Sequence, residues 1–171
     1  MAIERKEQSR RMTKHKLDDD SGALKVCNKA IKINPSDAGT YIARGNAKIR
    51  LGDYSGAIED HTKAIEIDPN YSLAYINRGF VKVELGDHSG GIEDYTKAIK
   101  IDPNDSLAYF ERGIAKDELG NHTGAIKDLT KAIELDSNYA NAYFNRGGSK
   151  FKLGDYSGAI ADFTKSIEIY P

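Results

Sequence analysis

Residues 38–71 read AGTYIARGNAKIRLGDYSGAIEDHTKAIEIDPNY, and the same pattern recurs along the chain with a period of 34 residues. The glycine in its first half recurs at the same spacing, as Gly45, Gly79, Gly113 and Gly147. A fixed period of this length is typical of stacked copies of one small unit, each of which contacts only its neighbours. The sequence therefore predicts a repeat array rather than one globular core.

The period divides the 171 residues into a single array of five repeats: 4–37, 38–71, 72–105, 106–139 and 140–171. The first repeat is degraded, because residues 4–17 contain almost no apolar side chain. Asp18, Asp19 and Asp20 follow this stretch. We expect these three residues to form a solvated turn, because they lack the spaced ligands of a calcium loop.

Each repeat is expected to form two helices. Ala57, His61, Ala64 and Ile65 lie at positions i, i+4, i+7 and i+8, which is the spacing of one helix face. The sequence Leu-Gly-Asp at residues 51–53 suits a helix end followed by a new N-cap, and a proline follows the second helix at Pro69. No stretch alternates as a strand would. The fold class predicted is therefore all-α.

This pattern resembles the tetratricopeptide repeat family. The tryptophan position of the family is held by Tyr41, Tyr75, Tyr109 and Tyr143. The phenylalanine position is held by His61, Tyr95, Leu129 and Phe163. The resemblance implies a right-handed superhelical α-solenoid of helical hairpins that acts as a non-catalytic scaffold or adaptor for a protein or peptide partner.

Three charged residues recur in the four good repeats, and two of them depart from the family pattern. The arginines are Arg44, Arg78, Arg112 and Arg146, and the lysines are Lys48, Lys82, Lys116 and Lys150. The aspartates are Asp60, Asp94, Asp128 and Asp162. Arginine and lysine are four residues apart and share a helix face, which an antiparallel hairpin would place opposite the aspartate. We expect a structural ion ladder between helices, and the alternative is a basic strip for an acidic partner.

Composition and motifs exclude several other classes of function. The 25 basic and 26 acidic residues give a net charge of −1, which provides no electrostatic attraction to nucleic acid. No long apolar run predicts membrane insertion, and no apolar segment near Met1 predicts secretion, so we expect a cytoplasmic protein. No histidine or cysteine pair has metal-ligand spacing, and no nucleophile with a base can be assembled. We therefore expect no enzyme activity, cofactor or metal.

In the family that the chain resembles, ligands contact the concave face formed by the first helix of each repeat. Carried over, the peptide-groove residues are Ile42, Asn46, Ile49, Leu73, Ile76, Phe80, Val83, Leu107, Phe110, Ile114, Asn141, Phe144 and Phe151. Most are apolar, which favours an apolar peptide or helix with Phe80, Phe110 and Phe144 as anchors. The alternative is that curvature of the array buries these side chains against one another. A clamp for a C-terminal carboxylate is disfavoured, because Glu111 stands where a cation is needed.

A competing hypothesis is self-assembly. The last helix is apolar on one face, and Ile160, Phe163 and Ile167 have no following cap in the sequence. Either the chain is cut from a longer array, or it is a self-assembling module that forms a weak homodimer through this face.

Overall fold

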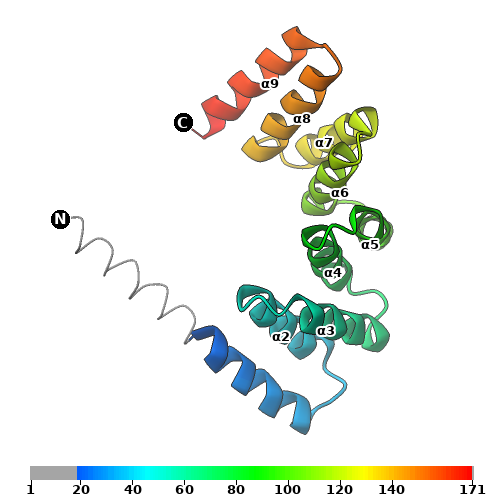
Figure 1. Cartoon of the computed structure of the whole chain (residues 1–171), viewed down its shortest axis with the longest axis vertical. Helices are drawn as coiled ribbons and strands as arrows, with labels where there is room; N and C mark the ends of the chain where they lie inside the picture. The colour runs from blue at the N-terminus through cyan, green and yellow to red at the C-terminus, as the bar shows by residue number, and fades with distance from the viewer. Residues whose placement is uncertain (1–18, 171) are drawn as a thin grey trace, which may run out of the picture. The chain divides into compact units, whose positions relative to one another are not determined.

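The computed structural model of the chain describes residues 19–170. The chain divides into two compact parts, an N-terminal part (Met1–Val81) and a C-terminal part (Lys82–Pro171). All regular structure in residues 19–170 is helical, and the helices follow one another as tandem hairpins, as Figure 1 shows. The prediction of an all-α hairpin array is therefore confirmed.

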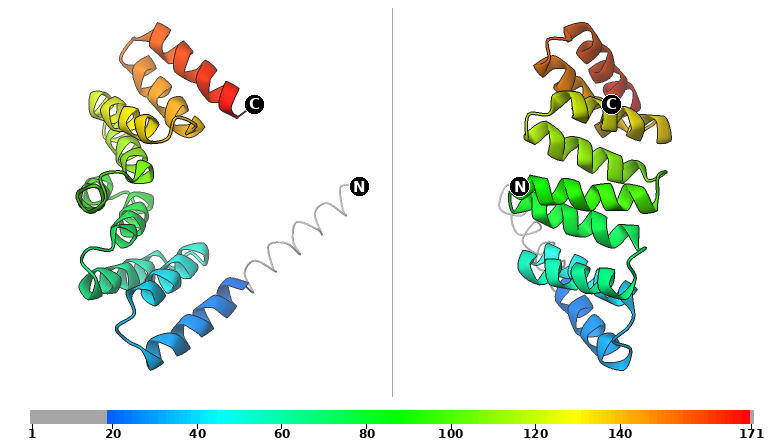
Figure 2. Two further views of the ribbon diagram at one scale, coloured as in Figure 1. Left: turned by 180° about the vertical axis from the view of Figure 1, so that it is seen from behind. Right: turned by 90° about the vertical axis from the view of Figure 1, so that its right-hand side faces the viewer.

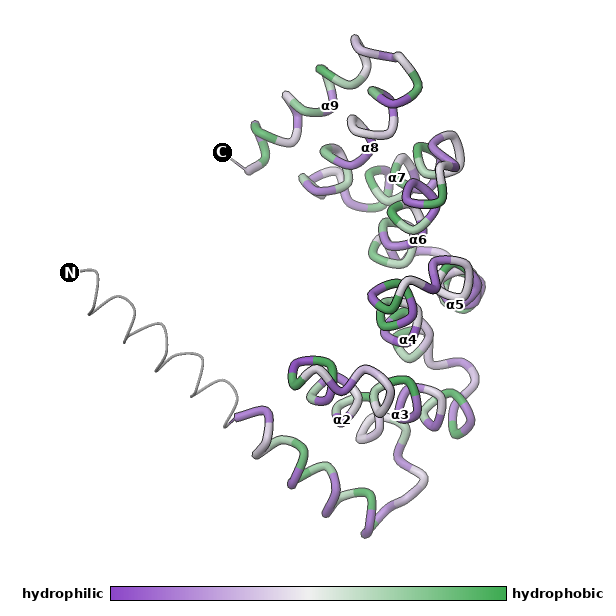
Figure 3. Tube along the Cα trace, viewed as in Figure 1, coloured by the Kyte–Doolittle hydropathy of each residue, from purple (hydrophilic) through white to green (hydrophobic). Residues whose placement is uncertain are grey.

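The helices have nearly uniform lengths. Residues 19–33 form the first described helix. The helices that follow are α2 (Ala38–Arg50), α3 (Tyr54–Ile67), α4 (Ser72–Glu84), α5 (His88–Ile101), α6 (Ser106–Glu118), α7 (His122–Leu135), α8 (Ala140–Lys152) and α9 (Tyr156–Ile169). Apolar and polar residues alternate along each helix in Figure 3, as expected for helices that bury one face.

The start of the array differs from the prediction. Asp19 and Asp20 lie in the first described helix, so the expected turn is wrong for these two residues; Asp18 and the polar stretch 4–17 lie outside the described residues. The Asp20 carboxylate accepts a hydrogen bond of 2.5 Å from Nε of Arg50 on α2. This cross-helix ion pair gives the aspartate a structural role that a solvated turn would not require.

The turn within each hairpin follows from the Leu-Gly-Asp sequence. Gly52 has φ of +80°, a left-handed conformation that favours glycine, and its N–H bonds to the carbonyl of Ile49 at 3.0 Å. The N–H of Asp53 bonds to the carbonyl of Lys48 at 2.9 Å, which completes a Schellman motif. The Asp53 side chain then accepts from the N–H of Gly56 and caps α3. One short sequence thus ends one helix and begins the next.

Neighbouring helices approach closely because small residues line their contacts. In the N-terminal part α2 packs on α3, and in the C-terminal part α5 to α9 pack in sequence order (Figure 2). A Cβ placed on Gly113 of α6 would lie only 2.9 Å from Cγ of Leu129 on α7. Ala125, Leu129 and Ala132 are fully buried in the same core. Gly113, one of the glycines that define the period, therefore marks a point of close helix approach.

Two adjacent glycines on α8 should respond to alanine substitution with opposite signs. A Cβ on Gly147 would lie 2.8 Å from the Phe163 ring, whereas a Cβ on Gly148 would meet nothing within 4 Å. We expect Gly148→Ala to raise the free energy of unfolding by about 0.5–1 kcal/mol through helix propensity. We expect Gly147→Ala to lower it by about 1 kcal/mol through overpacking. Thermal denaturation followed by circular dichroism tests both, and shifts of the same sign would contradict the packing described here.

Candidate functional site

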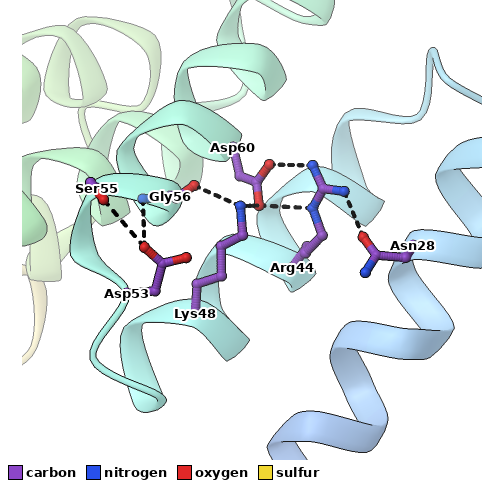
Figure 4. A network of polar contacts seen from close by, with 7 residues as sticks. All are labelled: Asn28, Arg44, Lys48, Asp53, Ser55, Gly56 and Asp60. Atoms are coloured by element: carbon purple, nitrogen blue, oxygen red, sulfur yellow. Dashed lines mark hydrogen bonds and ion pairs between the residues drawn. The ribbon is translucent and has the colours of Figure 1, made fainter.

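The recurring charged residues form networks that join the two helices of a hairpin. In Figure 4, Arg44 and Lys48 of α2 both point at Asp60 of α3. Asp60 accepts from Arg44 Nε at 2.9 Å and lies 2.9 Å from Lys48 Nζ. Arg44 Nη1 donates to Asn28 in the preceding helix at 2.8 Å. The network therefore links three consecutive helices.

The C-terminal part repeats this arrangement. Asp128 accepts two hydrogen bonds of 2.8 Å from Arg112, and Lys116 Nζ donates to the same carboxylate at 2.7 Å. Arg112 Nη1 also donates to Thr96 Oγ1 on α5 at 3.1 Å, so the arginine bridges neighbouring hairpins. Asp162 receives Arg146 and Lys150 in the same way.

The arginine and the lysine of α4 each make a contact within their own part of the chain. In the N-terminal part Arg78 donates to Thr62 at 3.2 Å, and in the C-terminal part Lys82 lies 2.8 Å from Asp94.

The electrostatics of these networks favour a structural role. The hydrogen bond with Asp162 raises the pKa of Arg146. The equivalent hydrogen bond with Asp60 raises the pKa of Arg44. Burial opposes ionisation of Asp162, but hydrogen bonds from Arg146 and Lys150 outweigh it and lower the pKa of the carboxyl. The guanidinium of Arg44 also lies 5.4 Å from the centre of the Tyr41 ring. Cations paired in this way favour the structural ion ladder over the alternative of a basic strip for an acidic partner.

The sequence did not reveal the aromatic support of the arginines. Each arginine stacks on the tyrosine three residues before it, at centroid distances of 5.4 to 5.7 Å. The i, i+3 spacing of tyrosine and arginine, constant in all four repeats, was the available signal.

The expected groove residues fall into exposed and buried groups. The exposed ones are Leu73, Phe80, Leu107, Asn141, Phe144 and Phe151, and the half-buried ones are Asn46, Ile49, Val83 and Ile114. In the N-terminal part, Asn77 Nδ2 donates to Asn46 Oδ1 at 3.0 Å, so these amides join α4 to α2. In the C-terminal part α6 and α8 are in contact, and Phe144 and Phe151 are 59% and 58% exposed.

Three expected contact residues are buried instead. Ile42, Ile76 and Phe110, which occupy equivalent positions in successive repeats, are 3% to 8% exposed. Phe110 packs in the core with Ala125 and Leu129, and its ring centre lies 4.7 Å from that of Tyr139, in the turn before α8. Phe110, which was expected to be an anchor of the groove, instead fills the junction between neighbouring hairpins and is not exposed.

A polar network that joins α6 to α8 was not predicted from the sequence. Asp117 stands where other repeats have Ile49, Val83 and Phe151. Its carboxylate accepts from Ser149 Oγ at 2.7 Å and Lys152 Nζ at 2.6 Å, and lies 2.7 Å from Nδ1 of His122. Burial opposes ionisation, but these hydrogen bonds outweigh it and lower the pKa of Asp117. The network holds α6 beside α8. The sequence feature that could have predicted it is a single acidic residue at a repeat position that is apolar in the other repeats.

Comparison with family models identifies the repeats. One model, described as TPR repeat, matches residues 45–86 and 118–153, and three models described as Tetratricopeptide repeat match residues 73–105, 94–127 and 140–171. The chain belongs to the tetratricopeptide repeat (TPR) family. TPR proteins bind protein partners and generally act as scaffolds rather than as catalysts.

Solved TPR structures are similar over most of the chain. A crystal structure of MamA has a TM-score of 0.81 at 25% identity, covering 88% of each chain. MamA from Desulfovibrio magneticus RS-1, residues 41 to the end, has a TM-score of 0.80 at 22% identity, covering 95% of this chain and 93% of that one. YrrB is described as a TPR protein with an unusual peptide-binding site. It has a TM-score of 0.74 at 23% identity, covering 90% of this chain and 79% of that one. No curated protein sequence matches the chain.

Helix α9 carries the residues that were expected to mediate self-association. Ile160 and Ile167 of α9 are each 66% exposed, and they are seven residues apart, on one side of the helix. Phe163 is half-buried, because its ring packs over Gly147 and lies 5.4 Å from the Phe144 ring.

Other kinds of site find no support in residues 19–170. No group of three or more acidic, histidine or cysteine side chains in this range could hold a metal ion. None of its helices is long and apolar enough to cross a membrane. Cys27 is buried as a free thiol.

Proposed function

We propose that this TPR protein is a non-catalytic scaffold that binds an apolar peptide or helix on the first helices of its repeats, most clearly on α6 and α8. The observation that carries the proposal is the exposure of Leu107, Phe144 and Phe151. Leu107 and Phe151 lie outside the buried stripe that holds the hairpins together, whereas Phe144 is exposed at the position where Ile42, Ile76 and Phe110 are buried. Apolar side chains left together on one surface of a folded protein are typical of a binding site.

The geometry of α8 supports this surface. Phe144 and Phe151 are seven residues apart and therefore lie on the same side of the helix. Gly148 lies between them, and the space above its Cα is open. The Asp117 network holds α6 beside α8 through Ser149 and Lys152. A rigid pair of helices with two aromatic rings beside an open glycine suits an extended or helical segment laid across it.

The fold family and its structural relatives are consistent with the proposal. TPR repeats imply protein–protein interaction, and YrrB is described as a peptide-binding TPR protein. In the N-terminal part, Leu73 and Phe80 are exposed apolar residues on α4. These provide a second, smaller surface of the same kind.

Alanine substitution on α8 tests the proposal. A peptide selected from a random library on the wild-type chain provides the probe, with an expected dissociation constant of about 1 μM. We expect Phe144→Ala and Phe151→Ala each to weaken its binding about tenfold, because exposed aromatic residues dominate interface energies. Calorimetric titration measures the effect. Tyr170→Ala, which removes an 81% exposed aromatic ring after α9, is the matched control. If both α8 variants bind as the control does, the surface is assigned wrongly.

Self-association through α9 is a second candidate function, favoured by the exposure of Ile160 and Ile167. Burial of this apolar face against a second copy would contribute about 25 cal/mol per Å², from which the cost of association is subtracted, and so supports a weak dimer. We expect the mass from light scattering to rise with concentration. Combined Ile160→Glu and Ile167→Glu substitution should keep the chain monomeric. A wild-type mass that stays monomeric throughout the concentration series would refute this candidate.

A further inference from the structure

Gly148 leaves an open space between two exposed phenylalanine rings on α8. Phe144 precedes the glycine by four residues and Phe151 follows it by three, so all three residues lie on one side of the helix. A Cβ placed on Gly148 would meet nothing within 4 Å. We call this open space, flanked by Phe144 and Phe151, the α8 notch.

The two rings that flank the α8 notch are each supported by an aromatic ring of α9. The centre of the Phe144 ring lies 5.4 Å from that of Phe163, and the centre of the Phe151 ring lies 5.3 Å from that of Tyr156. Aromatic pairs at these distances attract each other. The sides of the notch are therefore positioned in the free chain, and binding does not have to order them.

The equivalent residues of other repeats show what size of side chain fits at this position. All are larger than glycine: Asn46, Phe80 and Ile114. Ile114 of α6 is half-buried and packs against the core that contains Phe110, the residue equivalent to Phe144. A side chain of the size of isoleucine therefore fits beside an aromatic ring at this position of a repeat. The repeat that begins at residue 140 has none to place there.

Helix packing does not require a glycine at position 148. A glycine within a helix is less stable than an alanine, and this cost is justified where two helices approach closely. Gly147 is such a case, because its Cβ would meet the Phe163 ring at 2.8 Å, whereas Gly148 has open space above it. The structural consequence of the second glycine is the α8 notch itself.

We propose that the α8 notch holds one large aliphatic side chain, leucine or isoleucine, of the peptide bound on α6 and α8, and that Gly148 determines this specificity. The inference rests on the proposed function. The inserted side chain takes the place on α8 that Ile114 fills on α6, between the rings of Phe144 and Phe151. A charged side chain in the same place would lose its hydration without gaining a partner, so the notch selects against it.

Substitution of Gly148 tests the notch with a peptide selected on the wild-type chain from a displayed random library. Gly148→Ile supplies from the chain itself the side chain that the peptide would insert, and should weaken binding about tenfold or more in a calorimetric titration. Gly148→Ala should also weaken binding, although thermal denaturation should show a more stable helix. Gly22→Ala is the matched control: it lies in the helix formed by residues 19–33, its Cβ also meets nothing within 4 Å, and it should bind as the wild type does.

A pair of peptides then assigns the effect to one side chain. Alanine scanning of the selected peptide identifies the inserted leucine or isoleucine. Its replacement by alanine should weaken binding to the wild type about tenfold or more, but should have little effect on binding to Gly148→Ile, where the notch is already filled. An equal loss on both proteins would overturn the notch.

The two levels of the proposal fail in different ways. If Gly148→Ile binds the peptide as the wild type does while Phe144→Ala and Phe151→Ala weaken it, the notch is overturned and the proposed function stands. If none of these three substitutions changes the affinity, or if no peptide can be selected on the wild-type chain, both are overturned.

Discussion

Replacing Asp128 by alanine is expected to lower the free energy of unfolding by about 3 kcal/mol, the largest loss among the substitutions considered. The carboxylate is almost fully buried and holds both Arg112 and Lys116. Its removal leaves two cations that are only 15% and 21% exposed without a counter-charge. Chemical denaturation measures the change. Glu134→Ala, which removes an exposed i, i+3 pair with Lys131, should change stability by less than about 0.5 kcal/mol.

A double-mutant cycle assigns the loss to the ion pair. Arg112→Leu removes the partner that makes two of the hydrogen bonds to Asp128. We expect the combined variant to lose clearly less stability than the sum of the single variants, because neither charge is then left alone. Strict additivity would mean that the arginine and the aspartate do not stabilise each other.

Replacing His61 by leucine is expected to raise the free energy of unfolding by about 2 kcal/mol, because a buried polar ring without partners is replaced by an apolar side chain. Both ring nitrogens of His61 are buried and lack hydrogen-bond partners within the described residues. Leu129 occupies the equivalent position in a later repeat and packs over Gly113 as His61 packs over Gly45. Denaturation at pH 7 tests the gain. A loss of stability would mean that the leucine does not fit this core.

The wild-type chain should lose stability in acid because of His61, and His61→Leu should not show this loss. Burial lowers the pKa of His61 from 6.5 to about 4, so below pH 6.5 the unfolded chain binds a proton that the folded chain does not. Wild-type stability should therefore fall as the pH falls from 6.5 toward 4, by about 2 kcal/mol at pH 5, and level off below the folded-state pKa.

Glu111 acts in the opposite direction over part of this range. Its raised pKa means that the folded chain gains stability as the pH falls from about 7 toward 4.5. Because Glu111 is present in both proteins, the difference between the wild type and His61→Leu isolates the histidine. A difference that does not change between pH 7 and pH 5 would contradict the buried, neutral state of His61.

The repeat period and the turn residues were enough to predict the hairpins. Gly52 and Asp53 act locally, through one backbone conformation and one cap, so their structural effect does not depend on the rest of the chain. The pairing of Arg112 with Asp128 could be predicted for a similar reason: an antiparallel hairpin with a fixed turn places residues 16 apart opposite each other.

The binding surface could be predicted only in part. Phe110 is buried because Tyr139, in the turn before α8, packs against its ring. No pattern within one repeat reveals that contact. The Asp117 network likewise depends on residues 32 and 35 positions later.

The central claim is that a peptide binds to the exposed apolar residues of α6 and α8. The most direct test is to map backbone amide NMR shifts when a library-selected peptide is added to the chain. Changes concentrated around Leu107, Phe144, Gly148 and Phe151 are the expected result. Changes concentrated on α7 or α9, with these four positions unaffected, would contradict the claim.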